Sequence, residues 1–206
     1  MTKIKLCGLS RPCDIQTANE LMPEYIGFVF APKSKRYIDP QQAAQLKELL
    51  SPDIRAVGVF VDEAPDTVAA LLNNGIIDIA QLHGGEDEAY IQRLRQRTDQ
   101  PIIKAFQIKS CHDLAKATAC ATACAADHIL LDSGAGTGNV FDWSVLRDVK
   151  RPYFLAGGLS PDNVGDAVRL LHPYAVDVSS GIETDGYKDE EKAAAFIAAV
   201  RKEGQS

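Results

Sequence analysis

The chain has 206 residues, of which 46% are hydrophobic and 24% are charged, and its formal net charge is -6. This composition excludes a wholly disordered chain, and the length fits one domain over residues 1–206. The acidic balance argues against a nucleic-acid-binding protein, which needs a dense basic surface, but it is compatible with a small anionic ligand.

Nothing in the sequence is typical of export or of a membrane span. Residues 1–7 lack the apolar core of a signal peptide, and charged residues interrupt every apolar run well before membrane-spanning length. The five cysteines are an odd number, which argues against a disulfide framework. We therefore expect a cytoplasmic protein with reduced thiols, no membrane association and no obligate protein partner.

Short apolar runs rich in β-branched residues alternate with amphipathic stretches along the chain. The runs predict strands over residues 3–7, 25–30, 56–60, 78–82, 102–106, 128–132, 153–156 and 175–178. The helical patterns include residues 41–50, 65–74, 86–97, 110–125, 161–171 and 190–202. Ser160 is the predicted N-cap of the helix that starts at Pro161. This alternation predicts parallel strands, because each parallel pair needs a crossover that a helix usually supplies.

The number and spacing of these units favour an α/β fold of the (β/α)8 TIM-barrel type. Units of roughly 25 residues bring the chain near the lower length limit of that fold, about 200 residues. The strands are mostly continuous apolar runs, as burial on both faces requires. An open, doubly wound sheet is the alternative, but the regular units and the lack of an obvious edge strand favour closure.

Two glycine-containing loops near the end of the chain predict an anion site. Gly157 and Gly158 follow the seventh predicted strand, and Ser180 and Gly181 follow the eighth. Glycine permits close backbone approach, and free amides at a helix start bind anions. A tight turn alone would also explain the first pair. In a TIM barrel, however, the loops after strands seven and eight often hold phosphate, so we predict a phosphorylated small-molecule ligand.

Cys7 and Asp132 are the candidate reactive groups, because each ends a predicted strand on the rim where barrels place function. Cys7 is either an inert buried thiol or, with the basic Arg11 close by, a functional thiolate. Asp132 either caps a turn or serves as a general acid. In the second case partial desolvation is expected to raise its pKa.

Three more rim residues have both a structural and a functional interpretation. Arg36 is either a solvated surface charge or a bidentate clamp for a substrate carboxylate. Gln81 and His83 follow the fourth predicted strand, and His83 is equally consistent with a structural hydrogen bond and with a functional role.

The remaining cysteines and glycines do not form a known ligand motif. Cys120 and Cys124 lie near Cys111 and His112, but no CxxC pair supports a zinc site, so no metal is predicted. Residues 134–138 are glycine-rich but lack the spacing of a nucleotide-binding loop. We interpret them as a mobile lid, with Asp142 capping the short helix that follows.

The motifs taken together resemble the phosphoribosylanthranilate isomerase family over essentially the whole chain. The matching segments are KLCGL (5–9), GFVF (27–30), PKSKRY (32–37), VGVFV (57–61), QLHG (81–84), LDS (131–133), GTG (136–138), FDW (141–143), AGGL (156–159), DVSSGIE (177–183) and KD (188–189). No single segment is decisive, but their order and the chain length make chance similarity improbable.

The resemblance implies an Amadori rearrangement in tryptophan biosynthesis. N-(5-phosphoribosyl)anthranilate would become 1-(2-carboxyphenylamino)-1-deoxyribulose 5-phosphate, with Cys7 as general base and Asp132 as general acid. One acid and one base suffice, so no cofactor or metal is expected. The reaction needs a thiolate on Cys7 and a neutral carboxyl on Asp132, so the environment must push their pKa values in opposite directions.

The resemblance also implies how the substrate is held. Arg36 would bind the anthranilate carboxylate, while Gln81 and His83 would line the pocket. The phosphate would lie on Gly157, Gly158, Ser180 and Gly181.

Two other functions stay open. A related barrel of histidine biosynthesis isomerises a phosphoribosyl-aminoimidazole carboxamide, but a typical member has a carboxylate at the position of Cys7 and two phosphate-binding repeats. A barrel that only senses a phosphorylated metabolite would bind its ligand without turnover.

Overall fold

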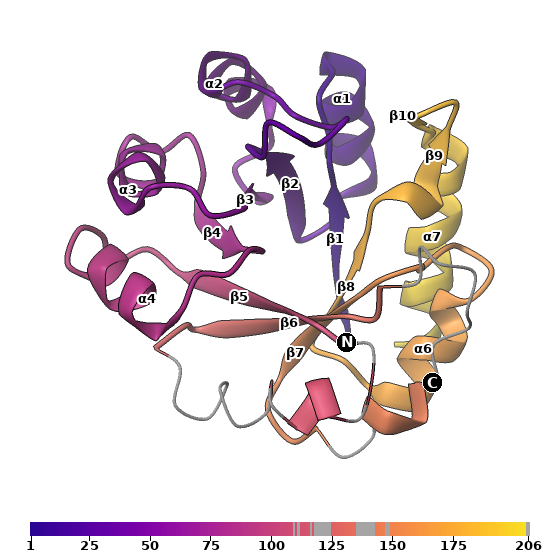
Figure 1. Cartoon of the computed structure of the whole chain (residues 1–206). Coiled ribbons are helices and arrows are strands. Elements are labelled where there is room, and N and C mark those ends of the chain that lie inside the picture. The colour runs from indigo at the N-terminus through magenta and orange to yellow at the C-terminus, as the bar shows by residue number, and fades with distance from the viewer. Residues whose placement is uncertain are drawn as a thin grey trace.

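The computed structural model describes residues 1–108, 110, 112–115, 117, 125–134, 143–146 and 149–204. Its strands form one closed parallel barrel in the order β1-β2-β3-β4-β5-β6-β7-β8, with helices around the outside (Figure 1). The strands are β1 Lys3–Cys7, β2 Tyr25–Val29, β3 Arg55–Phe60, β4 Ile79–Leu82, β5 Ile102–Gln107, β6 His128–Asp132, β7 Tyr153–Ala156 and β8 Ala175–Val178. The predicted barrel is confirmed, and the open sheet is excluded because β8 pairs with β1.

The helices cover the barrel between successive strands. They are α1 Pro12–Leu21, α2 Pro40–Leu49, α3 Pro65–Asn73, α4 Glu88–Arg95, α6 Val164–Leu171 and α7 Glu190–Glu203. Their starts follow the expected local chemistry: Asp39, Asp87 and Asp189 each accept a hydrogen bond from a backbone N–H in the first turn of α2, α4 and α7. Proline occupies the first turn of α1, α2 and α3, where no N–H is needed.

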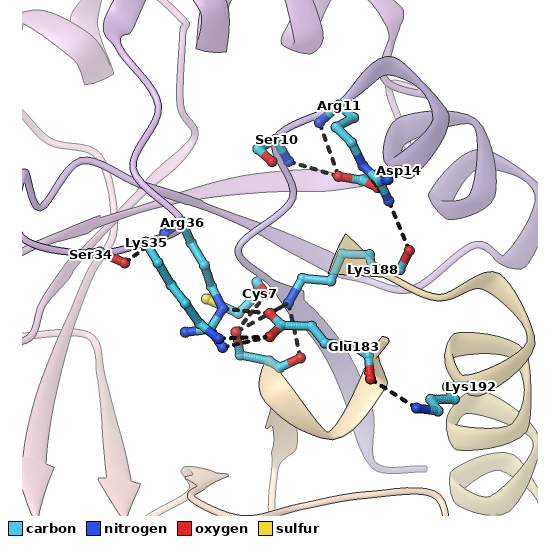
Figure 2. A network of polar contacts seen from close by, with 11 residues as sticks. Cys7, Ser10, Arg11, Asp14, Ser34, Lys35, Arg36, Glu183, Lys188 and Lys192 are labelled. Atoms are coloured by element: carbon cyan, nitrogen blue, oxygen red, sulfur yellow. Dashed lines mark hydrogen bonds and ion pairs between the residues drawn. The ribbon is translucent and has the colours of Figure 1, made fainter. Parts of the chain in front are cut away.

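Three short elements lie in the later loops. They are the 3-10 helices η1 Trp143–Leu146 and η2 Ser180–Ile182, and the hairpin of β9 Glu183–Thr184 with β10 Tyr187–Lys188. The hairpin follows η2 directly, and it brings Lys188 back toward the end of β8 (Figure 2).

Two predicted helix starts are wrong. Helix α6 begins at Val164 rather than at Pro161, because residues 161–163 form a turn closed by hydrogen bonds from the Asn163 and Val164 N–H groups to the Ser160 carbonyl. The Asn163 side chain accepts from the Ser160 N–H, so Ser160 does not cap a helix with its own side chain. Helix α4 begins at Glu88 because Asp87 caps it, whereas Glu86 is buried in an ion pair with Lys104.

Several predicted features lie outside the described residues. They include most of the helix predicted over 110–125, most of the lid predicted over 134–138, Cys111, Cys120, Cys124 and Asp142. Residues 112–115 and 117 are helical. In the described part of the chain no helix has the length and apolarity to cross a membrane.

The alternation of each strand decides which side chains reach the barrel interior. Ile4 and Leu6 pack outward against the helices, whereas Val57, Ile79, Leu130 and Phe154 belong to a separate cluster inside the barrel. Successive inward positions lie two residues apart. The inward series therefore ends at the carboxyl ends of the strands with Cys7, Val29, Val59, Gln81, Asp132, Ala156 and Asp177, all of which line one cavity.

Candidate active site

A cavity of about 360 Å³ opens at the carboxyl ends of the barrel strands. Its size lies within the range of small-molecule sites, roughly 300–1,000 Å³. Most of the predicted site residues line it: Cys7, Arg36, Gln81, His83, Asp132, Gly157, Gly158 and Ser180. Gly181 does not. Residues from six different strands or their loops are therefore brought together, although the sequence separates them by up to 173 positions.

Cys7 lies on the β1 wall of the cavity, with 8% of its surface exposed. Burial raises the pKa of its thiol, and the nearby Asp177 carboxylate raises it further. The positive charges of Lys5 and Lys188 lower it, but not enough to offset burial. This direction of the pKa shift favours the neutral Cys7 thiol near pH 7, which is opposite to the expected thiolate.

Lys5 lies two residues before Cys7 and is fully buried on the same side of β1. Its ammonium donates to Asp177 Oδ1 at 3.0 Å, across the closing β1–β8 pair. Burial acts to lower the pKa of Lys5, but the charges of Asp177 and Cys7 outweigh it and raise the pKa. A Cβ on Gly27 would lie 2.7 Å from Cys7 Sγ and 3.2 Å from Lys5 Nζ. The sulfur and the ammonium thus share a space that only glycine at position 27 leaves open.

Asp132 lies at the end of β6, on another wall of the cavity. His83 Nε2 is 3.3 Å from its Oδ2, and the Gly134 backbone N–H donates to its Oδ1 at 2.9 Å. Burial acts to raise the pKa of Asp132, but these two donors overcome it and lower the pKa. Asp132 is therefore a carboxylate at neutral pH, which corrects the expectation of a raised pKa. The pKa of Cys7 is thus raised and that of Asp132 is lowered, whereas the reverse was expected for both.

Gln81 fixes the orientation of His83. Gln81 Nε2 lies 2.9 Å from His83 Nδ1, and because the amide nitrogen is a donor, Nδ1 accepts and the ring hydrogen lies on Nε2, facing Asp132. The amide oxygen of the same side chain, Gln81 Oε1, is buried and has no hydrogen-bond partner among the described residues.

The two predicted phosphate loops lie against each other. A Cβ on Gly181 would lie 1.9 Å from the Leu159 carbonyl oxygen, so only glycine permits this approach of the η2 backbone to the loop after β7. Gly157 has φ +98°, and a Cβ there would lie 2.7 Å from Asp132 Oδ1. Gly181 thus lets the two loops pack against each other, while Gly157 places the first loop beside the Asp132 carboxyl.

Arg36 lines the cavity but is already paired with a carboxylate of the protein. Its Nε and Nη2 donate to Glu183 Oε1 and Oε2 at 2.5 and 2.9 Å. Figure 2 shows Lys188 approaching the same Glu183 carboxylate from the other side of the site, with Nζ to Oε1 at 2.7 Å. The sequence analysis placed Arg36 correctly on the rim, but it did not identify its partner.

Four residues that the sequence analysis did not single out belong to the site: Lys5, Asp177, Glu183 and Lys188. The signal available for the first pair was Lys5, a charged residue between Ile4 and Leu6 at the inward position before Cys7. Glu183 and Lys188 lie in segments that carry the family resemblance, but nothing local assigned either of them a role. Among the described residues, no group of three or more His, Cys, Asp or Glu side chains is arranged to hold a metal ion.

Comparison with known proteins identifies the family. The family model of N-(5'-phosphoribosyl)anthranilate (PRA) isomerase matches residues 4–199. The N-(5'-phosphoribosyl)anthranilate isomerase of Endomicrobium trichonymphae is 44% identical over 206 residues, covering 98% of this chain and 99% of that relative. The enzyme of the same name from Thermoanaerobacter sp. (strain X514) is 44% identical over 204 residues, covering 98% of each chain.

Solved structures agree with this assignment. The crystal structure of phosphoribosyl anthranilate isomerase from Thermotoga maritima superposes with a TM-score of 0.88 at 35% identity, covering 98% of this chain and 100% of the other. A crystal structure of phosphoribosyl anthranilate isomerase in complex with reduced 1-(o-carboxyphenylamino)-1-deoxyribulose 5-phosphate gives a TM-score of 0.86 at 35% identity, with the same coverage. With the fold, the cavity and these relatives in agreement, the chain belongs to the PRA isomerase family.

Proposed function

We propose that Cys7 and Asp132 perform the proton transfers of the PRA isomerase reaction in this protein. The reaction converts N-(5'-phosphoribosyl)anthranilate into 1-(2-carboxyphenylamino)-1-deoxyribulose 5-phosphate, a step of tryptophan biosynthesis. The observation that carries the proposal is that Cys7 from β1 and Asp132 from β6 line one cavity, with two glycine loops at one side and Arg36 at another.

The first step opens the furanose ring. Asp132 in its protonated form gives its proton to the ring oxygen, the bond between C1 and that oxygen breaks, and the anthranilate nitrogen supplies the electron pair that forms the iminium. Asp132 is left as a carboxylate, the state that His83 and the Gly134 N–H stabilise. These donors therefore favour the charge that develops in this step.

The second step moves a proton from carbon to sulfur. The iminium acidifies the C2–H, the Cys7 thiolate removes that proton, and the enolamine that forms tautomerises to the ketone. Cys7 ends as a neutral thiol, which burial favours. The neutral Cys7 thiol and the Asp132 carboxylate present after these two steps are thus the forms that the surroundings of the two groups favour. One proton must return from Cys7 to Asp132 before the next turnover, and the total number of protons is unchanged.

The substrate is held at both ends. The loops of Gly157, Gly158 and Ser180 would receive the phosphate, with Gly181 holding the loops together, and Arg36 would bind the anthranilate carboxylate. Gln81 would line the pocket and orient His83 through its amide nitrogen. Two anchors hold the reacting carbon between acid and base. We place the enzyme in the cytoplasm, because a phosphorylated metabolite is retained inside the membrane.

A coupled assay of wild type, Cys7→Ala and Asp132→Asn tests the proposal. Each variant is expected to lose at least about a hundredfold in rate, as removal of a general acid or base does. Cys13→Ala and Asp53→Asn are matched controls at exposed positions and keep wild-type rates, with folding checked by circular dichroism. A near-wild-type rate for a site variant removes that residue from its role. Turnover of the phosphoribosyl-aminoimidazole carboxamide alone, or ligand binding without turnover, would overturn the assigned activity.

A further inference from the structure

Glu183 is the centre of a cluster of three cations. Its carboxylate receives two hydrogen bonds from Arg36 and one from Lys188, and Lys35 Nζ lies 3.6 Å from Oε2. The side chain of Glu183 is only 6% exposed. Burial acts to raise its pKa, but the hydrogen bonds from Arg36 and Lys188 lower the pKa to about 2. Glu183 is therefore an anion at neutral pH, and its three cations leave the cluster with two positive charges in excess.

Among the described residues, the pairing with Glu183 leaves part of the Arg36 guanidinium without a hydrogen-bond partner. Glu183 uses Nε and one hydrogen of Nη2, so the end formed by Nη1 and the remaining Nη2 hydrogen is left for another acceptor. The stem of Arg36 is fixed as well: Gly8 has φ +82°, and a Cβ there would lie 2.5 Å from Arg36 Cδ. The Arg36 side chain thus packs closely on Gly8 and is oriented by its ion pair with Glu183.

Lys188 connects the same carboxylate to the loop after β8. Its ammonium donates to Glu183 Oε1, to the Ser179 carbonyl at 2.9 Å and to Ser179 Oγ at 3.2 Å, which uses all three of its hydrogens. Ser179 Oγ in turn donates to the Cys7 carbonyl at 3.0 Å. One continuous network therefore joins Arg36, the loop that carries Ser180 and the end of the Cys7 strand (Figure 2).

We propose that Glu183 is a positioning residue for substrate binding. It presents the end of the Arg36 guanidinium that it does not use itself to the substrate carboxylate. Through Lys188 it also fixes the distance between Arg36 and the loop at 179–181. This inference rests on the proposed function, because it takes Arg36 as the carboxylate anchor and that loop as part of the phosphate site. The excess positive charge explains how Arg36 attracts a second carboxylate although it is already paired. The fixed separation would favour substrates whose carboxylate and phosphate match it.

A double-mutant cycle of Glu183→Gln and Arg36→Ala tests this role. The glutamine keeps the size of Glu183 but places an amide donor against the guanidinium. We expect Glu183→Gln to raise KM about tenfold with kcat changed less than about threefold, since positioning for binding affects ground and transition states alike. In the Arg36→Ala background the same change should add no further increase in KM. Multiplied effects on KM would overturn the proposal, because they would show that Glu183 acts without Arg36.

Two further variants separate positioning from general stability. Asp189→Asn removes a carboxylate from the same segment that caps α7 and does not touch Arg36, so KM should stay at the wild-type value. Glu183→Asp keeps the charge, so its KM should lie between those of the wild type and Glu183→Gln. A KM as high as that of Glu183→Gln would count against the proposal. If Glu183→Gln does not fold, Glu183→Asp replaces it in the cycle. An inactive wild type would overturn the proposed function itself, whereas an active wild type with independent effects overturns only the role of Glu183.

Discussion

The two walls of the cavity treat their ionisable groups in opposite ways. On the β1–β8 wall, Cys7 is buried beside Lys5 and Asp177, and desolvation outweighs the neighbouring positive charges. On the β6–β7 wall, Asp132 is less deeply buried, and two hydrogen-bond donors outweigh desolvation. Full charges near Cys7 shift its pKa less than burial does, because Asp177 already neutralises Lys5. Short contacts from the His83 ring and one backbone amide suffice for Asp132, because both reach its oxygens directly.

This difference determines the expected pH dependence. The reactive form needs a thiolate and a protonated carboxyl, yet the base has the higher pKa. Between the two pKa values, the form with a Cys7 thiolate and a protonated Asp132 is a small fraction of the enzyme that does not change with pH. A plot of kcat/KM against pH should therefore be flat across neutral pH. The acid limb should fall below the usual carboxyl range and the alkaline limb above the usual thiol range. The three predictions below break or sharpen the contrast between the walls.

The largest effect is expected from Lys5→Met. Lys5 lowers the pKa of Cys7, so its loss raises that pKa further, shrinks the reactive fraction and moves the alkaline limb to higher pH. Each unit of pKa change costs a factor of ten in that fraction, so kcat/KM at neutral pH should fall at least about tenfold. The pH dependence of Cys7 alkylation by iodoacetamide, followed by peptide mass spectrometry, measures the thiol directly.

The control for Lys5→Met addresses the carboxylate that it leaves behind. Removing one partner of a buried ion pair destabilises a protein by about 3–5 kcal/mol, whereas removing both is far milder. Lys5→Met with Asp177→Asn should therefore fold better than the single variant. An alkylation profile that is unchanged in the single variant would show that Lys5 does not influence the thiol.

A smaller and opposite effect is expected from His83→Ala. The variant removes one of the two donors to Asp132, so the pKa of Asp132 rises and the acid limb of kcat/KM moves to higher pH. A larger fraction of Asp132 is then protonated at neutral pH, so the reaction keeps its general acid. The rate at neutral pH should therefore change by less than about tenfold. His172→Asn, at an exposed helix end, is the matched control and should leave the profile unchanged. A shift of the alkaline limb instead would contradict the separation of the two walls.

The smallest effect is the stabilisation of both walls by inorganic phosphate. The loops proposed to bind phosphate approach Asp132 through Gly157 and contact the Cys7 strand through Ser179. At ten times its Kd, phosphate should add about 1.4 kcal/mol of stability and raise Tm by about 4 °C. Differential scanning fluorimetry measures this, with sodium chloride at equal ionic strength as the control. Equal melting temperatures in the two salts would argue against a phosphate site.

Much of the fold follows from local patterns. Each barrel strand lies within one or two residues of its predicted run, because strands buried on both faces need continuous apolar, β-branched segments. The start of α6 was wrong because Ser160 and Pro161 are equally compatible with a turn. Hydrogen bonds between the Asn163 side chain and the Ser160 backbone decided between the two structures.

By itself the sequence indicated eight alternating strand and helix units and favoured their closure into a barrel. It also placed Cys7 and Asp132 at strand ends, and Arg36 in the loop after the second strand, on one rim. Only the tertiary structure decided what those groups contact. Closure of β8 onto β1 sets Lys5 opposite Asp177, and the hairpin after η2 brings Glu183 and Lys188 to Arg36. These pairs join positions up to 172 residues apart. Periodicity reports which face of an element is buried, whereas a pKa depends on every charge and donor within a few ångströms, whichever element supplies it.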